Sequence, residues 1–453
     1  MPQSQKNFVY LLLSHLLIGA LLYQFPEFSR VYTLLILAIS IFCIVRNKNR
    51  NHEALCAAAY IVGSEVFLRM NEGNPTYEFG KYSVICFSIL GIYYSGFVKK
   101  ALTYLIFILL LVPGILIAFN ILEEPKLPKI VFDISGPVCL AVASIYTFRK
   151  KITQAALDNI LLWMSLPILS CCFYLFLYCP DVNKVRFSTE SSFALSGDFG
   201  PNQVAITLGL GMFLFFYRLV MRSESMLETA INLIITTSIC YRGILTFSRG
   251  GMLVGVMMMI GFAVLIYLNR KKYKPFYFKS KITAVMISFL AVILVISYQS
   301  KGFITKRYTN KDFYGNERRE KAYGRQNLAK TDINTFKKAP FLGIGTAVAK
   351  QVRTKTLNMK VSSHNEISRL LSEHGIFGFA ALMLLFAMPF SLFLREKQYI
   401  FRLVFLTFWL LTVSHSGMRI AAPSFLYALA LLHIKWKSEE LQPTHFGNST
   451  LLP

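Results

Sequence analysis

A histidine stands at the start of a short helical pattern late in the chain. Segment 361–375 reads Val-Ser-Ser-His-Asn-Glu-Ile-Ser-Arg-Leu-Leu-Ser-Glu-His-Gly. Ser363 followed three residues later by Glu366 has capping-box spacing, which predicts that a helix begins at His364, and Gly375 is typical of a C-terminal stop. The positive end of the helix dipole disfavours an imidazolium, so a neutral His364 is expected to accept a proton as a general base. The alternative is an ordinary surface histidine.

The same pattern places charged residues on one helix face. Glu366, Arg369 and Glu373 follow one another at spacings of three and four residues. Side chains at these spacings are neighbours on a helix surface. The simplest interpretation is an ion ladder exposed to solvent.

Two arginines lie where charge is costly. Arg242 lies within an apolar segment and Arg249 lies at its outer end, seven residues later. Seven residues make about two helical turns, so both side chains are expected to face the same side. Charges within a membrane usually line a cavity or bind a ligand. The alternatives are an ion pair of Arg242 with Glu65, and a position of Arg249 with its charge at the membrane surface.

A loop with glycine and polar residues leads into another apolar segment. It reads Ser-Gly-Asp-Phe-Gly-Pro-Asn-Gln-Val-Ala over 196–205, and Pro201 is well placed at a helix start. Its exposed amides, with Asn202, suit contacts with a diphosphate or a sugar. A plain transition from loop to helix explains the segment equally well.

The composition indicates a membrane protein. Of 453 residues, 55% are hydrophobic and 16% are charged, whereas soluble domains carry about 25% charged residues. The apolar residues form blocks close to the roughly 20 residues that a helix needs to cross a bilayer. We therefore predict an all-α polytopic membrane protein with about 12–14 transmembrane helices. The candidate segments are Phe8–Phe25, Val31–Val45, Ala54–Leu68, Tyr82–Phe97, Ala101–Phe119, Val131–Phe148, Ile160–Tyr178, Val204–Val220, Thr229–Phe247, Gly250–Leu268, Ile282–Tyr298, Ile376–Leu394, Phe401–Ser414 and Ile420–Ile434.

The distribution of Lys and Arg predicts the orientation. The connections that fall inside when the N-terminus is cytoplasmic are much richer in Lys and Arg than the short outer ones. The first segment lacks the cleavage site of a signal peptide and is expected to be retained. The predicted organisation is transmembrane helices over 1–298, a large outer loop over 299–375, transmembrane helices over 376–434 and a cytoplasmic tail over 435–453.

The large outer loop is long, polar and rich in Lys and Arg, which favours an anionic ligand. The alternative is a solvated basic loop that touches the outer leaflet. The net charge of +25 is spread over loops of a membrane protein, so anionic lipid headgroups are the expected partner and nucleic acid is not. The eight cysteines lack the paired spacing of zinc or redox sites.

Four motifs follow one another through the second half of the chain. They are Phe199-Gly-Pro-Asn-Gln-Val-Ala205; Leu245-Thr-Phe-Ser-Arg-Gly-Gly251; Tyr323-Gly-Arg-Gln-Asn327 with Ala339-Pro-Phe-Leu-Gly-Ile-Gly345; and Ser363-His-Asn-Glu366 with Glu373-His-Gly-Ile-Phe-Gly378. Together with the large outer loop, they resemble the O-antigen ligase superfamily. Because four motifs occur in order, the resemblance is more specific than any one of them.

The resemblance implies a membrane-embedded glycosyltransferase fold of the GT-C-like type. It implies an inverting, metal-independent enzyme without a cofactor, whose donor is a glycan linked to undecaprenyl diphosphate. His364 resembles the catalytic histidine of the family, and Arg249 and Arg325 resemble the arginines that bind the donor diphosphate, with Arg242 as a third candidate. The secondary substrate-binding candidates are Asn202, Asn365 and Glu373.

By this resemblance the protein lies in a bacterial inner membrane, has both termini in the cytoplasm, and acts on the periplasmic side. Ligation of O-antigen to lipid A core is the expected reaction. Fourteen candidate segments exceed the twelve spans typical of the ligases, so a polysaccharide polymerase and a protein O-oligosaccharyltransferase remain alternatives. A transporter of the lipid-linked glycan is the non-enzymatic alternative, but the chain shows no internal repeat of the kind that transporters often have.

Overall fold

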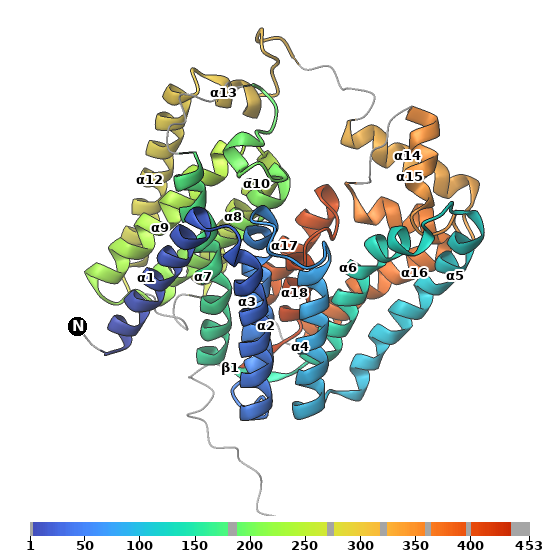
Figure 1. Ribbon diagram of the computed structural model, residues 1–453, viewed down its shortest axis with the longest axis horizontal. Coiled ribbons are helices and arrows are strands. Elements are labelled where there is room, and N and C mark those ends of the chain that lie inside the picture. The colour runs from blue at the N-terminus through green and yellow to red at the C-terminus, as the bar shows by residue number, and fades with distance from the viewer. Residues whose placement is uncertain are drawn as a thin grey trace, which may run out of the picture.

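The computed structural model is a bundle of helices with two very short strands (Figure 1). It describes residues 3–179, 188–269, 276–317, 324–357, 364–395 and 400–435. Within these ranges, 9 helices are long and apolar enough to cross a membrane, and Ile400–His415 is a shorter apolar helix. The prediction of an all-α polytopic membrane protein is confirmed.

Each predicted segment except the last coincides with a helix or with part of one. These helices are α1 (Gln3–Gln24), α2 (Phe28–Asn47), α3 (Glu53–Met70), α4 (Phe79–Ser95), α5 (Thr103–Ile121), α6 (Lys126–Thr147), α7 (Gln154–Tyr178), α8 (Pro201–Met221), α9 (Met226–Leu245), α10 (Arg249–Leu268), α12 (Phe278–Gln299), α16 (Glu366–Arg395) and α17 (Ile400–His415).

The last predicted segment, Ile420–Ile434, is not a single span. It contains α18 (Ala422–Leu429), whose eight residues are all buried. A helix of that length is about 12 Å long, well short of the roughly 30 Å hydrocarbon core. After α18 the chain forms β2 (His433–Lys435), which pairs in parallel with β1 (Lys151–Thr153). The segment is apolar because α18 packs against α6 and α17, and a helix buried in protein has the same composition as one buried in lipid.

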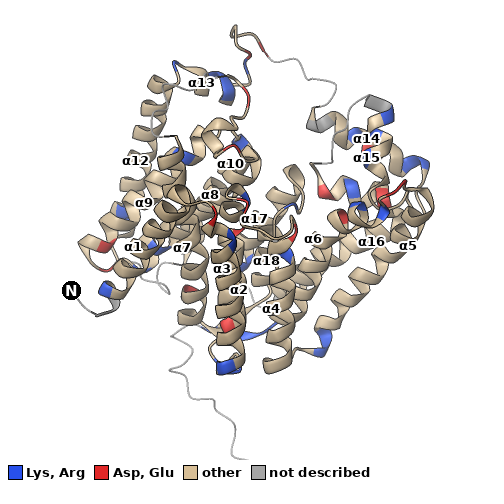
Figure 2. Ribbon diagram, in the orientation of Figure 1, with Lys and Arg blue, Asp and Glu red and all other residues tan. Residues whose placement is uncertain are grey.

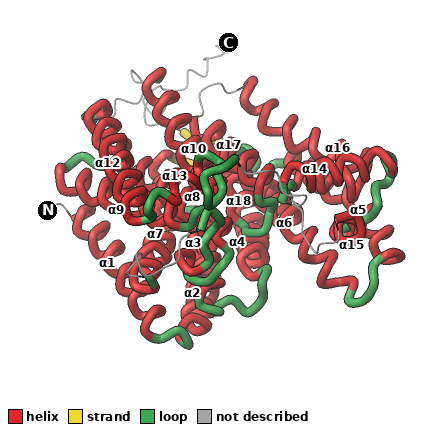
Figure 3. Tube along the Cα trace, turned by 90° about the horizontal axis from the view of Figure 1, so that it is seen from above, coloured by secondary structure: helices red, strands yellow, loops and turns green. Residues whose placement is uncertain are grey.

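The helices form two groups with α17 and α18 between them. Figures 1 and 3 place α1, α9 and α12 on one side, and α5, α15 (Val348–Leu357) and α16 on the other. α17 packs into both groups, because Phe405 and Phe408 belong to the hydrophobic cluster of the first and Trp409 and Val413 to that of the second. The C-terminal end of α17 therefore lies where the two groups meet.

Helices α8 and α10 touch through their backbones. Ala205 and Gly209 on α8 face Gly251 and Gly255 on α10, and each pair is spaced by one helical turn. A Cβ on Gly209 would lie 2.3 Å from the carbonyl oxygen of Gly251, and a Cβ on Gly255 would lie 2.5 Å from that of Gly209. Small residues at this spacing let transmembrane helices approach closely. The contact fixes the N-terminus of α10, and with it Arg249, against the N-terminus of α8.

The large polar segment after α12 lies at one end of the bundle. It contains α13 (Phe303–Tyr308), α14 (Arg325–Lys338) and α15, which are at the top of Figure 1, whereas β1 is at the opposite end. Figure 2 shows Lys, Arg, Asp and Glu gathered around α14, α15 and the start of α16, while the long helices are mostly uncharged.

The polar segment is tied to the membrane helices by backbone hydrogen bonds. The amide of Ile344 donates to Ser372 O at 3.0 Å, that of Gly345 to Glu373 O at 3.0 Å, and that of Thr346 to Gly114 O on α5 at 2.9 Å. The helical run α16 breaks at Gly375, where φ is 59° and ψ is −134°. The predicted stop at Gly375 is confirmed, and it separates a short outer helix from the span that follows.

We predict that Gly251→Ala destabilises the protein and that Gly261→Ala, on the same helix, does not. The new methyl at 251 would lie 2.3 Å from the backbone of α8, whereas that at 261 would meet nothing within 4 Å. Overpacking costs about 1–3 kcal/mol, and alanine in an unobstructed helix gains about 0.5–1 kcal/mol over glycine. Thermal unfolding of the two variants in the same detergent measures the difference. Equal melting temperatures would contradict the close α8–α10 contact.

Candidate active site

The start of α16 carries His364 just outside the helix. The Oδ1 atom of Asn365 accepts hydrogen bonds from the amides of Ile367 at 2.9 Å and Ser368 at 3.2 Å, so Asn365 is the N-terminal cap. The predicted helix start at His364 is wrong by two residues, because α16 begins at Glu366. Ser363, the first residue of the predicted capping box, lies outside the described residues.

The charged residues at the start of α16 are buried. Arg369 donates through Nη1 to Glu373 Oε2 at 2.7 Å, through Nε to Glu366 Oε2 at 3.2 Å, and through Nη2 to the carbonyl oxygen of Asp133 on α6 at 3.0 Å. The exposed fractions of Arg369, Glu366 and Glu373 are 5%, 6% and 1%. The ion ladder expected at the surface is thus an internal cluster, because α6 and the polar segment cover this face. Glu373, a candidate substrate-binding residue, forms an ion pair with Arg369.

A second buried ion pair joins α14 and α15 to the same helix. Arg353 on α15 pairs with Asp332 on α14, and both side chains are buried. Asp332 also accepts a hydrogen bond from Ser368 Oγ at 2.9 Å. Arg325 is the first residue of α14, seven residues before Asp332, so the two positions lie on one side of that helix. The backbone of Arg325 is described and its side chain is not.

Arg249 opens α10 after a tight turn. The helix before it ends at Leu245, and Phe247 has a φ of 56°, in the left-handed region. Arg242 and Arg249 therefore lie on different helices, and the expectation that both face one side of a continuous helix is wrong. Ser248 Oγ donates to Asn202 Oδ1 on α8 at 2.7 Å. Asn202 thus stabilises the turn that precedes Arg249.

Arg307 on α13 also stabilises this turn. Arg307 donates through Nε to the carbonyl oxygen of Phe247 at 2.9 Å and through Nη1 to that of Thr189 at 3.0 Å. Loss of water around Tyr308 raises the pKa of its phenol, and the nearby charges of Arg249 and Arg307 oppose the rise. Arg249 is therefore near Tyr308 on α13. The sequence offered no signal for Arg307 beyond membership of a basic loop.

Arg242 is fully buried, with an exposed fraction of 0%. It donates to the carbonyl oxygens of Cys179 at 3.3 Å and Leu195 at 3.4 Å, and its guanidinium lies 5.2 Å from the centroid of the Phe176 ring. These contacts tie the end of α7 to the loop that precedes α8. In this structure Arg242 is bound to backbone carbonyl groups.

The alternative pairing of Arg242 with Glu65 is not formed. Glu65 pairs with Arg69 at 2.6 Å and accepts a hydrogen bond from the amide of Ala421 at 2.7 Å. Arg69 also donates to Gln203 Oε1 at 2.8 Å and to the carbonyl oxygen of Arg419 at 3.2 Å. Glu65 and Arg69 therefore join the start of α8 to the connection between α17 and α18.

The end of α17 joins the two parts of the site. A Cβ on Gly250 would lie 2.6 Å from Nε2 of His415, and a Cβ on Gly417 would lie 3.2 Å from Oε2 of Glu366. Segment 415–417 therefore contacts the residue after Arg249 on one side and the helix that follows His364 on the other. The sequence analysis assigned no role to this segment, although Gly417 and nearby Arg419 lie between two apolar runs.

In the part of the chain that the structure describes, no three His, Cys, Asp or Glu residues are grouped to hold a metal ion. Metal independence stays a prediction. The groups that come together at this end of the bundle are a histidine, buried carboxylates and several guanidinium groups. Such groups suit proton transfer and the binding of an anion.

The fold and this site define a multi-pass membrane protein with polar chemistry at one end of its bundle. Residues 233–383 match the family model described as O-Antigen ligase. The match runs from α9 into α16 and includes Arg249, Arg325 and His364, whereas Asn202 lies before it. The match confirms the predicted resemblance to the O-antigen ligase superfamily over these residues.

The match supports glycan transfer of the O-antigen ligase or polymerase type in general. The family acts on lipid-linked glycans. A comparison with curated proteins finds no match.

We predict that Asn365→Ser preserves most activity and that Asn365→Ala does not. Serine caps helices about as well as asparagine, whereas loss of a cap costs about 1 kcal/mol and loosens the turn that holds His364. Glycan transfer by the two variants, in membranes containing equal amounts of protein, provides the comparison. If serine and alanine were equally damaging, the amide group of Asn365 would instead contact substrate, as the sequence predicted.

Proposed function

We propose that this protein transfers a glycan from an undecaprenyl-diphosphate carrier to an acceptor hydroxyl on the periplasmic face of a bacterial inner membrane. The acceptor is the core oligosaccharide of lipid A, and the product is glycan-bearing lipopolysaccharide. In this proposal segment 299–375 is the periplasmic loop and both ends of the chain are cytoplasmic.

The observation that carries the proposal is the position of the end of α17. On one side it contacts Gly250, next to the arginine that opens α10, and on the other it contacts Glu366, two residues after His364. An anion-binding group and a proton acceptor therefore lie on either side of one short segment. Both lie at the end of the bundle that carries α13, α14 and α15 (Figure 1). In the proposed orientation this end is periplasmic, where the carrier diphosphate lies at the membrane surface.

In the proposed reaction Arg249 and Arg325 bind the diphosphate. Guanidinium groups suit this role because they make paired, charge-assisted hydrogen bonds to phosphate oxygens. His364 takes the proton from the acceptor hydroxyl while its oxygen attacks the anomeric carbon from the face opposite the diphosphate. The new glycosidic bond forms as the bond to the diphosphate oxygen breaks, which inverts the anomeric configuration. The leaving carrier diphosphate gains one negative charge, which the two arginines stabilise.

No metal ion has a step in this reaction, since the arginines compensate the charge of the leaving group and the donor is already activated. Asn365, Glu366 and Arg369 hold the backbone next to His364 through the cap and the buried cluster. Asn202 and Arg307 hold the turn next to Arg249. Asn202, Asn365 and Glu366 belong to the family motifs, and these contacts give them a role that does not require them to touch substrate.

We predict that His364→Ala lowers transfer by about 10²–10⁴-fold, the usual contribution of a general base. The experiment is complementation of a null strain, with lipopolysaccharide and carrier-linked glycan separated on gels and detected by blotting. Unligated polymer on the carrier would support ligation, single-repeat glycan would indicate a polymerase, and loss of glycoprotein alone would indicate a protein transferase.

The matched control is His52→Asn. His52 lies between α2 and α3 with a φ of 62°, a conformation that asparagine tolerates. It should behave like wild type. Normal lipopolysaccharide in the His364→Ala strain would remove the proposed role of His364.

We predict that a chelator leaves the transfer rate of purified protein unchanged. The protein is reconstituted with carrier-linked donor and acceptor, treated with EDTA and assayed with and without added Mg²⁺. Loss of activity with EDTA that Mg²⁺ restores would contradict a reaction that relies on arginines alone.

A further inference from the structure

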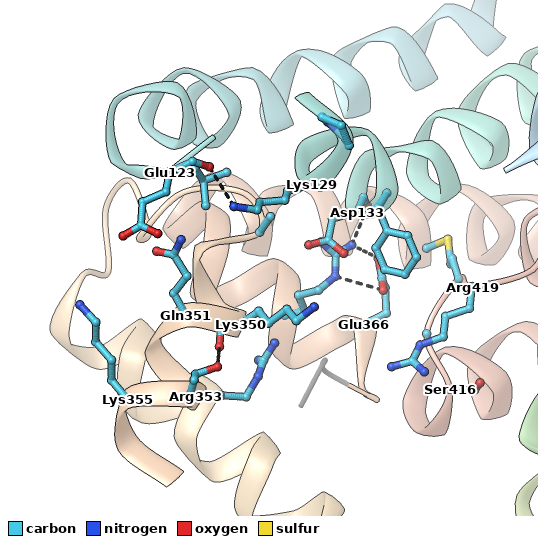
Figure 4. Close-up of a pocket in the computed structure, with 18 residues that line it drawn as sticks. Glu123, Lys129, Asp133, Lys350, Gln351, Arg353, Lys355, Glu366, Ser416 and Arg419 are labelled. Carbon is cyan, nitrogen blue, oxygen red and sulfur yellow. Dashed lines mark hydrogen bonds and ion pairs between the residues drawn. The ribbon is translucent and has the colours of Figure 1, made fainter. Parts of the chain in front are cut away.

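A large cavity lies beside the start of α16, and the proposed reaction has not yet assigned it a role. Its volume is about 700 Å³, within the usual range for small-ligand sites. We call it the α15 pocket. Its walls come from α6, α15, the start of α16 and the connection after α17, and its lining includes Phe132, Asp133, Lys350, Glu366 and Arg419 (Figure 4).

The floor of the pocket is a fixed polar surface. Arg369 binds Glu366 and the backbone of Asp133, and Arg353 pairs with Asp332 behind it. Because these charges compensate one another within the protein, the floor offers oriented oxygen and nitrogen atoms. The side chain of Asp133 remains 20% exposed, so its carboxylate is accessible to a ligand hydroxyl.

The walls add positive charge. Lys350 and Lys355 on α15 line the pocket, and Arg419 approaches from the opposite side. In Figure 4, Lys350 and Arg419 both point toward the space beside Glu366. The two guanidinium groups of the floor are paired with carboxylates, so the positive charge that an anionic group on the ligand would meet is that of Lys350.

An aromatic pair supplies an apolar face. Phe132 lines the pocket and is 38% exposed, and its ring lies 5.7 Å from that of Tyr77, which is 44% exposed. The guanidinium of Arg69 lies 4.1 Å from the centroid of the Tyr77 ring and stabilises it from the other side. A pyranose ring has one face of C–H groups and a rim of hydroxyls, so it matches an aromatic surface beside carboxylates and cations.

The pocket lies on the acceptor side of the proposed reaction. Glu366 and Gly417 line it, and Glu366 is two residues after His364. Arg249 is on the opposite side of segment 415–417, because the next residue, Gly250, contacts His415. A saccharide in the pocket and a diphosphate at Arg249 would therefore lie on opposite sides of this segment, with Glu366, two residues after His364, on the pocket side.

Resting on the proposed function, we propose that the α15 pocket binds the acceptor, and that this acceptor is a saccharide bearing an anionic substituent, phosphate or carboxylate. The aromatic face packs against one sugar ring, the carboxylate of Asp133 accepts from its hydroxyls, and Lys350 binds the anionic group. The donor diphosphate does not enter this pocket.

The test is equilibrium binding to the His364→Ala protein in nanodiscs, which needs no turnover. The probe is the core oligosaccharide released from lipid A of the null strain, used with its phosphates and after enzymatic dephosphorylation. We expect the phosphorylated form to bind at least tenfold more tightly. Lys350→Gln should remove most of that difference, and Phe132→Ala should weaken both forms.

Lys337→Gln is the matched control, since Lys337 is exposed on α14 and does not line the pocket. It should bind as the parent does. Equal binding of both forms of the oligosaccharide, or unchanged binding by Lys350→Gln and Phe132→Ala, would overturn the proposal. The repeat-unit oligosaccharide released from the carrier is the third probe: charge-dependent binding of it instead of the core would assign the same site to a polymerase acceptor.

The two proposals fail separately. Transfer that persists in the His364→Ala protein contradicts the proposed function and leaves the binding result standing. In the active protein, Lys350→Gln should raise the acceptor KM about tenfold and leave the donor KM unchanged. A raised donor KM would place the donor in the pocket and overturn the assignment.

Discussion

One guanidinium group organises the outer end of this protein. Arg369 is shared by Glu366, Glu373 and the backbone of Asp133, so it joins the start of α16 to α6. Removing these charges from water is costly, and the cost is offset only where several hydrogen bonds with good geometry form at once. Because α14 attaches to the same helix through Asp332 and Ser368, the polar segment depends on this cluster for its position.

Two other arginines bind backbone carbonyl groups. Arg242 donates to the carbonyls of Cys179 and Leu195, and Arg307 to those of Phe247 and Thr189. Irregular backbone near a membrane needs such partners, since an unpaired buried carbonyl or amide is expensive there. Part of the high positive charge that pointed to an anionic ligand is therefore structural.

Hydropathy predicted the long helices well, because the bilayer imposes both length and composition on a span. It failed for Ile420–Ile434, where a short helix surrounded by protein has the composition of one surrounded by lipid. The buried state of Glu366, Arg369 and Glu373 could not be predicted from their spacing, since what covers them is α6, distant in sequence. The break between Thr229–Phe247 and Gly250–Leu268 was predicted, but the left-handed turn at Phe247 was not, because aromatic residues rarely adopt that conformation.

The parallel pairing of β1 with β2 bears on how the protein is assembled. The strand that follows α18 is among the last described parts of the chain, and it pairs with the connection between α6 and α7 at the end of the bundle opposite the site. The pairing joins segments that are far apart in the sequence, and segment 415–417 lies between α17 and this strand. A long loop must therefore close before the segment that contacts Gly250 and Glu366 is held at both ends, and such closure costs conformational entropy.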